Sequence, residues 1–223
     1  LSAVRAEPAR WHVIRINAHA PKSETDFFVL NFWRASCDVT VTSAQVARAE
    51  PQLSHVVAGP LAQGLAAYRT HVLGKRAPAW CAMLTRGEGV SPEHRVFNEG
   101  VRMVLLTPPD RVAQLTQQMG TRAEVVGLDA LDVRRAVAYV RSQGARTIMV
   151  EAGPSTASAL YEPPPLVDHL LISRCGAEVS PAAVGGALPT DDRLFGGLTQ
   201  LTSAPSDEQS GPWRFEHWVR ARP

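Results

Sequence analysis

The chain has 223 residues, of which 45% are hydrophobic and 20% are charged. These proportions are typical of a folded globular domain, and they exclude a disordered or fibrous protein. The 23 basic and 21 acidic residues leave a formal net charge of +2 and form no long run of one sign, so a nucleic-acid-binding surface is not expected. The longest apolar stretches fall far short of the roughly 20 residues that a membrane-spanning helix needs.

Cysteine usage and the first residues bear on the cellular compartment. Cys37, Cys81 and Cys175 lie far apart and lack the C-x-x-C spacing of a zinc site or a redox pair. They are expected to be reduced thiols in the core. The first twenty residues carry charges between short apolar pieces, so they lack the apolar block of a secretory signal. We therefore expect a cytoplasmic protein with no bound metal and with neither a nucleic acid nor a membrane as its partner.

The hydrophobic pattern alternates along the chain between the period of a strand and that of a helix. Residues 1–10 are expected to be a loose N-terminal segment. Ser23 is predicted to cap the first helix, with Asp26 completing a pattern that resembles a capping box. In chain order we predict a strand at 11–17, a helix at 23–35, a strand at 38–42, a helix at 61–73, strands at 79–85 and 101–107, a helix at 110–119, a strand at 123–126, a helix at 128–143, a strand at 147–150, a helix at 155–161 and a strand at 166–173.

Strands that alternate with helices predict an α/β protein whose sheet is mostly parallel. After residue 175 the pattern changes to loops rich in Pro and Gly, and the alternation at 213–219 predicts a terminal strand or hairpin arm at 203–222. The aromatic residues of this arm fit either core packing or an exposed interface. Residues 1–223 are therefore predicted to be a single domain with a mixed sheet.

The strongest local feature is a turn of small residues, Ala152 and Gly153, that joins a predicted buried strand to a helix. Pro154 suits the first helical position, and the free N–H groups of a helix start, with the hydroxyls of Ser155 and Thr156, can bind a phosphate. The alternative is an ordinary tight turn in which these two hydroxyls only cap the helix.

Signatures of other enzyme classes are absent from the sequence. It contains no zinc-deaminase motif, no Rossmann glycine motif, no P-loop and no nucleophile elbow. The seven histidines are scattered, and His169, inside an apolar strand, is expected to be structural rather than catalytic. The sequence assigns no catalytic residue.

Three pairs of segments match one known family in their order and spacing. The pairs are R-A-S-C-D at 34–38 with R-A-E-P at 48–51, M-L-T-R-G at 83–87 with P-E-H-R-V-F at 92–97, and V-E-A-G-P-S at 150–155 with L-V-D-H-L-L-I-S at 166–173. They are similar, respectively, to an L-R-A-x-x-D strand and A-x-D-P turn, a strand and turn followed by L-P-x-x-x-x-V-F, and a V-E-G-G-P turn and V-D-E-L strand. From about residue 11 onward the chain thus resembles the reductase domain of the riboflavin-biosynthesis deaminase-reductase family, a branch of the dihydrofolate reductase-like superfamily.

The resemblance implies a three-layer α/β/α fold with a mixed, mostly parallel central sheet and an antiparallel C-terminal arm. It also implies a homodimer that binds NADPH and reduces a carbonyl or imine by hydride transfer. The cofactor-binding positions that it implies are Ser43, Ala44, Thr85, Arg86, Glu151, Ala152, Gly153, Pro154, Ser155 and Thr156. Among these, the segment from Glu151 to Thr156 would hold the diphosphate, and Thr85 and Arg86 the adenosine 2′-phosphate. The implied substrate-binding positions are Asn17, Arg48 and Glu50.

Two of these positions have a simpler alternative in the residues themselves. Arg86 is equally well explained as a solvated arginine in a turn, and Glu50 as a solvated turn carboxylate.

The sequence departs from the family at three places. The family's glycine-rich turn after the second strand is Ser43-Ala44-Gln45 here, Ala152 replaces the first glycine of the Gly-Gly pair, and no Asp-Gly follows the first strand. The resemblance therefore predicts an NADPH-dependent reductase, similar to the riboflavin-pathway 5-amino-6-(5-phosphoribosylamino)uracil reductase, with a small heterocyclic or sugar-phosphate-like substrate. The alternative is a non-catalytic nucleotide-binding or partner-binding module on the same fold.

Overall fold

The structure is a computed structural model that describes residues 2–7, 10–209 and 211–221. The chain divides into two compact units. One consists of Phe28–Thr156, and the other of the residues up to Phe27 together with those from Ala157 onward. No helix within the described ranges is both long enough and apolar enough to cross a membrane.

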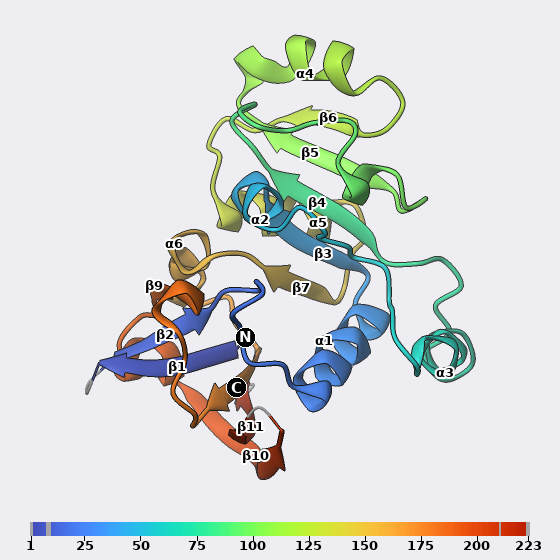
Figure 1. Cartoon of the computed structure of the whole chain (residues 1–223). Coiled ribbons are helices and arrows are strands. Elements are labelled where there is room, and N and C mark those ends of the chain that lie inside the picture. The colour runs from blue at the N-terminus through green and yellow to red at the C-terminus, as the bar shows by residue number, and fades with distance from the viewer. Residues whose placement is uncertain (1, 8–9, 210, 222–223) are drawn as a thin grey trace. The chain divides into compact units, whose positions relative to one another are not determined.

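The unit Phe28–Thr156 contains a five-stranded sheet in which every pairing is parallel. Its strand order is β6-β5-β4-β3-β7 (Figure 1). The strands are β3 (Val39–Ser43), β4 (Trp80–Leu84), β5 (Met103–Thr107), β6 (Glu124–Gly127) and β7 (Ile148–Glu151). Every residue of β3 and β5 is buried, as expected for parallel strands covered on both faces.

Short helices connect these strands. The α-helices are α2 (Ala44–Ala49), α3 (Ala62–Ala67), α4 (Val112–Met119) and α5 (Val133–Ser142), and the irregular ones are a π-helix, η1 (Tyr68–Val72), and the 3-10 helices η2 (Arg95–Phe97) and η3 (Pro109–Arg111). Helix α5 packs on β3 and β4 through four buried residues at helical spacing, Val133, Ala136, Val137 and Val140.

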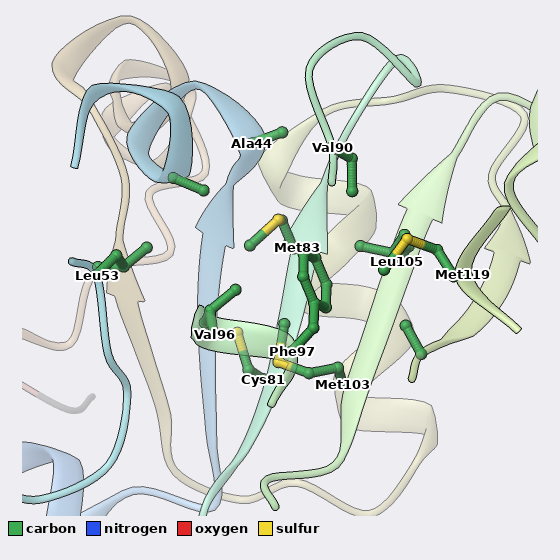
Figure 2. Close-up of a cluster of buried hydrophobic side chains, with 12 residues drawn as sticks. Ala44, Leu53, Cys81, Met83, Val90, Val96, Phe97, Met103, Leu105 and Met119 are labelled. Atoms are coloured by element: carbon green, nitrogen blue, oxygen red, sulfur yellow. The ribbon is translucent and has the colours of Figure 1, made fainter. Parts of the chain in front are cut away.

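The opposite face of the parallel sheet carries a cluster of buried apolar side chains (Figure 2). Cys81 and Met83 of β4 belong to it, whereas Ala82 between them does not, because successive side chains of a strand point to opposite faces. Leu105 of β5 and Phe97 of η2 complete the centre of the cluster.

The other unit contains a six-stranded mixed sheet with the order β10-β11-β8-β1-β2-β9. Its strands are β1 (Ser2–Glu7), β2 (Arg10–Ile14), β8 (His169–Cys175), β9 (Val184–Ala187), β10 (Leu198–Glu208) and β11 (Gly211–Arg220). β1 pairs parallel with β8, and the remaining pairings are antiparallel. Its short helices are η4 (Ser158–Tyr161), η5 (Pro181–Ala183) and α7 (Asp191–Phe195).

Two helices begin in one unit and end in the other, α1 (Glu24–Ser36) and α6 (Pro154–Ala157). The predicted cap of α1 is confirmed, because the N–H of Asp26 donates to Ser23 Oγ at 2.9 Å. The prediction of a helix at 155–161 is wrong in its extent. One α-helical turn, α6, is followed directly by the 3-10 turn η4.

The predicted α/β class is confirmed, and so is the antiparallel C-terminal arm, which is the hairpin β10–β11. The strands are distributed over two sheets instead of one central sheet. The expectation of a loose segment at 1–10 is wrong for residues 2–7, which form β1 because Ala3 and Val4 are buried and the strand pairs on both sides. The remaining residues of that segment are Arg10, which begins β2, and three that lie outside the described ranges. A single domain across 1–223 stays a prediction.

The three cysteines are free and buried, as predicted.

Candidate functional site

The order of the parallel strands identifies the edge where a ligand site is expected. From β3 the chain adds β4, β5 and β6 in one direction, and β7 then joins β3 on its other side. In open parallel sheets, ligands bind at the carboxyl ends of the strands where the strand order reverses in this way. The reversal lies between β3 and β7, which end at Ser43 and Glu151.

Three buried hydroxyl residues lie at the carboxyl ends of neighbouring strands. Ser43 ends β3, Thr107 ends β5, and Thr85 directly follows β4. Thr85 Oγ1 accepts a hydrogen bond from the N–H of Gly87 at 2.9 Å. Ser43 Oγ and Thr107 Oγ1 are buried without a hydrogen-bond partner among the described residues. Buried hydroxyls are normally bonded, so a partner supplied by a ligand or by water is expected at both.

The predicted phosphate-binding turn follows β7. A Cβ atom placed on Gly153 would have nothing within 4 Å, so the turn faces open space at this residue. The N–H of Thr156 is already bonded to the carbonyl of Gly153 at 3.0 Å, and Ser155 is exposed. Because α6 is a single turn, it has few aligned peptide dipoles, and the dipole contribution expected from a longer helix is small here. Within the predicted cradle, the backbone at Gly153 thus faces open space and Ser155 is exposed, whereas the N–H of Thr156 is already bonded.

Glu151 forms a buried ion pair directly before this turn. Arg34 of α1 donates from Nε to Glu151 Oε1 at 2.8 Å and from Nη2 to Oε2 at 2.5 Å. Thr42 Oγ1 donates to the Glu151 carbonyl at 2.8 Å, which fixes the backbone at the same point. Burial by itself would raise the pKa of Glu151, but the Arg34 guanidinium outweighs it and holds the pKa below the ordinary value. Glu151 is therefore ionised, and its charge is balanced by Arg34.

His55 lies against the same carboxylate. Its side chain is 2% exposed, and Nδ1 is 3.7 Å from Glu151 Oε2, which is within the range of an ion pair but too long for a hydrogen bond. Neither ring nitrogen has a hydrogen-bond partner in the part of the chain that the structure describes. Burial lowers the pKa of His55, and Glu151 only partly opposes the shift, so the ring is neutral at pH 7.

Glu50 is a second carboxyl group near this pair. It follows the last residue of α2 and is partly buried, and within the described residues its side chain makes no hydrogen bond or ion pair. Burial and then the charge of Glu151 raise its pKa to about 7, and Arg34 opposes the shift. A carboxyl group with this pKa exchanges a proton near neutral pH, which is the property of a general acid or base.

The remaining predicted positions lie in different surroundings. Arg86 is exposed on the loop after β4, and Arg48 Nη1 donates to the carbonyl of Glu88 in the same loop at 2.6 Å. Asn17 belongs to the other unit, where its amide donates to the carbonyl of Ala182 at 3.0 Å and its Oδ1 accepts from the N–H of His19 at 2.9 Å. Both polar side-chain atoms of Asn17 thus bond to backbone groups.

The structure brings Ser43, Thr85 and the turn after Glu151 to one edge, because β3 lies between β4 and β7. Sequence reasoning did not place Arg34, His55 or Thr107 in the site. Thr107 carried a signal, since it ends an apolar run just as Thr85 does. His55 carried none.

No family model and no curated protein matches the chain. Solved structures do match it. A pyrimidine reductase-like protein from Corynebacterium diphtheriae is 17% identical with a TM-score of 0.67, and the alignment covers 100% of this chain and 91% of that one. The riboflavin biosynthesis reductase of Saccharomyces cerevisiae is 10% identical with a TM-score of 0.60, over 98% of this chain and 87% of that one.

A third match is the diaminohydroxyphosphoribosylaminopyrimidine deaminase/5-amino-6-(5-phosphoribosylamino)uracil reductase of Thermotoga maritima. It is 14% identical with a TM-score of 0.62, and the alignment covers 89% of this chain but only 50% of that protein. The chain therefore has the dihydrofolate reductase-like fold of these reductases, which confirms the resemblance at the level of the fold.

Proposed function

We propose that the chain is an NADPH-dependent reductase of the riboflavin-pathway type, which reduces a carbonyl or imine carbon of a small heterocyclic or sugar-phosphate-like substrate. One observation carries the proposal. The hydroxyls of Ser43 and Thr107, buried without a partner among the described residues, lie at the same carboxyl edge of the parallel sheet as the open glycine turn, and Ser43 lies where the strand order reverses. The fold supports it, since the proteins of this fold named above are described as reductases or reductase-like.

The residues at this edge fit a dinucleotide that carries phosphate groups. The open space at Gly153 leaves room for a diphosphate against the backbone. Ser43 Oγ, at the end of β3, is buried and has no partner among the described residues. Arg86 is exposed and offers a guanidinium that suits a phosphate dianion. We assign the diphosphate to Glu151–Thr156 with Ser43 and Ala44, and the 2′-phosphate to Thr85 and Arg86.

The reduction also needs a proton, because the oxygen or nitrogen of the reduced bond receives an electron pair. NADPH supplies the hydride when it is bound. Glu50, with a pKa of about 7, is the group we assign to donate the proton. Glu151 cannot fill this role, since Arg34 holds it ionised, but its negative charge helps to keep Glu50 protonated.

Parallel titrations with NADPH, NADH and inorganic phosphate, followed by the thermal midpoint, test the cofactor assignment. A ligand at one hundred times its Kd stabilises the native state by about 2.7 kcal/mol. We expect NADPH to raise the midpoint more than NADH does. If neither nucleotide binds, the reductase proposal fails.

If NADPH binds but no carbonyl or imine substrate causes its oxidation, the chain is a nucleotide-binding module. The altered turn at Ser43-Ala44-Gln45 and the missing Asp-Gly motif favour this second function. We also propose a cytoplasmic homodimer, and light scattering that gives the mass of one chain would refute the dimer.

A further inference from the structure

The loop after β4 is held in one shape by its neighbours. Gly87 and Gly89 have φ values of 94° and 63°, in the left-handed region that favours glycine. Thr85 binds the N–H of Gly87, and Arg48 binds the carbonyl of Glu88. The loop therefore has a defined backbone.

Arg111, at the end of η3 after the neighbouring strand β5, lies alongside this loop. A Cβ atom on Gly87 would be 4.0 Å from Arg111 Cδ. The exposed fraction of the Arg111 side chain is 51%. Arg111 Nη1 donates to Gln114 Oε1 at 3.2 Å, and Nε lies 3.8 Å from the exposed carboxylate of Asp110. An exposed ion pair of this length is weak, so Arg111 keeps most of its attraction for an anionic ligand.

Three arginines thus lie on or against this loop, and they have different roles. The Arg48 guanidinium is occupied by the backbone of Glu88 and holds the loop. Arg86 is exposed on the loop, and the Arg111 side chain, which follows the next strand, lies against the loop at Gly87. A second guanidinium beside Arg86 suits a group with two negative charges, because a phosphate dianion accepts from several guanidinium N–H groups.

We propose that Arg111 is a specificity-determining residue that binds the 2′-phosphate of the cofactor together with Arg86, and so selects NADPH over NADH. This inference rests on the proposed function. It adds a residue that the sequence motifs do not include. It also implies that Asp110, which is negatively charged like the phosphate, weakens binding of the phosphate.

Equilibrium binding of NADPH and NADH to the full chain and its variants tests the assignment. Arg111→Ala is expected to raise the Kd for NADPH about tenfold and to leave the Kd for NADH unchanged, since NADH lacks the 2′-phosphate. Asp110→Asn is expected to lower the Kd for NADPH severalfold, because it removes a like charge. Arg141→Ala, an exposed arginine on α5, makes the same change in net charge and is the matched control.

The outcomes separate this inference from the proposed function. If the wild-type chain binds neither nucleotide, the proposed function fails. If the wild type binds NADPH and Arg111→Ala either changes nothing or weakens both nucleotides equally, the reductase proposal stands and the role of Arg111 is refuted. If Arg141→Ala weakens NADPH binding as much as Arg111→Ala does, the loss of net charge explains the effect, and the role of Arg111 is also refuted.

Discussion

Replacing Glu50 by Gln is expected to change the stability of the chain in a pH-dependent way. Folding raises the pKa of Glu50 from 4.5 to about 7. One pKa unit corresponds to about 1.4 kcal/mol, so the full shift would correspond to about 3 kcal/mol. Glu50 is only partly buried, and solvent screening reduces the expected linkage to about 1 to 2 kcal/mol.

The sign of the effect follows from which form of Glu50 the folded state prefers. A carboxyl group whose pKa rises on folding favours the protonated form in the folded state. Its contribution is complete below pH 4.5 and is lost as the pH rises through about 7. The Gln variant is neutral at every pH and does not lose this contribution. The free energy of unfolding of Glu50→Gln relative to wild type should therefore increase by about 1 to 2 kcal/mol between acid and mildly alkaline pH.

Urea unfolding at closely spaced pH values measures this difference. Glu88→Gln, which replaces an exposed carboxylate of the loop after β4, is the matched control. If the curves for Glu50→Gln and wild type stay parallel over the whole range, the raised pKa is refuted. In a reductase assay, the same variant should lower kcat about a hundredfold or more and remove the fall in rate above pH 7, because the proton donor is lost.

Three further substitutions test the rest of the site. Gly153→Val should fill the open space at the turn and weaken NADPH binding at least tenfold with little change in the thermal midpoint; an unchanged NADPH affinity would contradict the assignment of the turn. Arg34→Met should destabilise the chain by about 3 kcal/mol or more in urea unfolding, because it leaves the Glu151 carboxylate buried without its partner, and a loss below about 1 kcal/mol would show that the pair is hydrated. The folded state favours the neutral ring of His55, because its pKa is lowered on folding, so the wild type should lose stability as the pH falls below 6.5. His55→Gln should remove this loss. If the free energy of unfolding falls equally in both proteins at acid pH, other groups cause the loss.

The types of most elements were predictable from the sequence, because the period of apolar residues differs between a strand and a helix. Four of the five parallel strands end at a polar residue or glycine, β4 ends at Leu84 directly before Thr85, and each strand lies within about two residues of its predicted position. The boundaries were less accurate where capping decides them. Helix α5 begins at Val133 instead of 128, because the Asp132 side chain accepts from the N–H of Arg135 and caps the helix there. Strand β1 was missed because its pairing partners, β2 and β8, include one that is more than 150 residues away in the chain.

The position of the site at the edge of the sheet was predictable from the sequence, but the ionic contacts within the site were not. Ser43, Thr85 and Glu151 each end or follow an apolar strand, so alternation of strands and helices already places them at one edge. The pairing of Glu151 with Arg34 joins residues 117 positions apart, and the closeness of His55 depends on a loop with no regular structure. No period or motif encodes these contacts.

Those unpredicted contacts decide which carboxyl group can supply a proton. Arg34 neutralises Glu151 and holds it ionised, and buried His55 stays neutral and adds no positive charge at pH 7. Burial raises the pKa of Glu50, the charge of Glu151 raises it further, and the side chain has no ion-pair partner among the described residues, so its proton is retained up to about pH 7. Without the Arg34 pair, Glu151 itself would have the raised pKa of a buried carboxyl group, and the two residues would no longer differ in their protonation. The separation of one ionised and one protonated carboxyl group at this edge thus depends on the residue at position 34, which lies outside the turn that first identified the site.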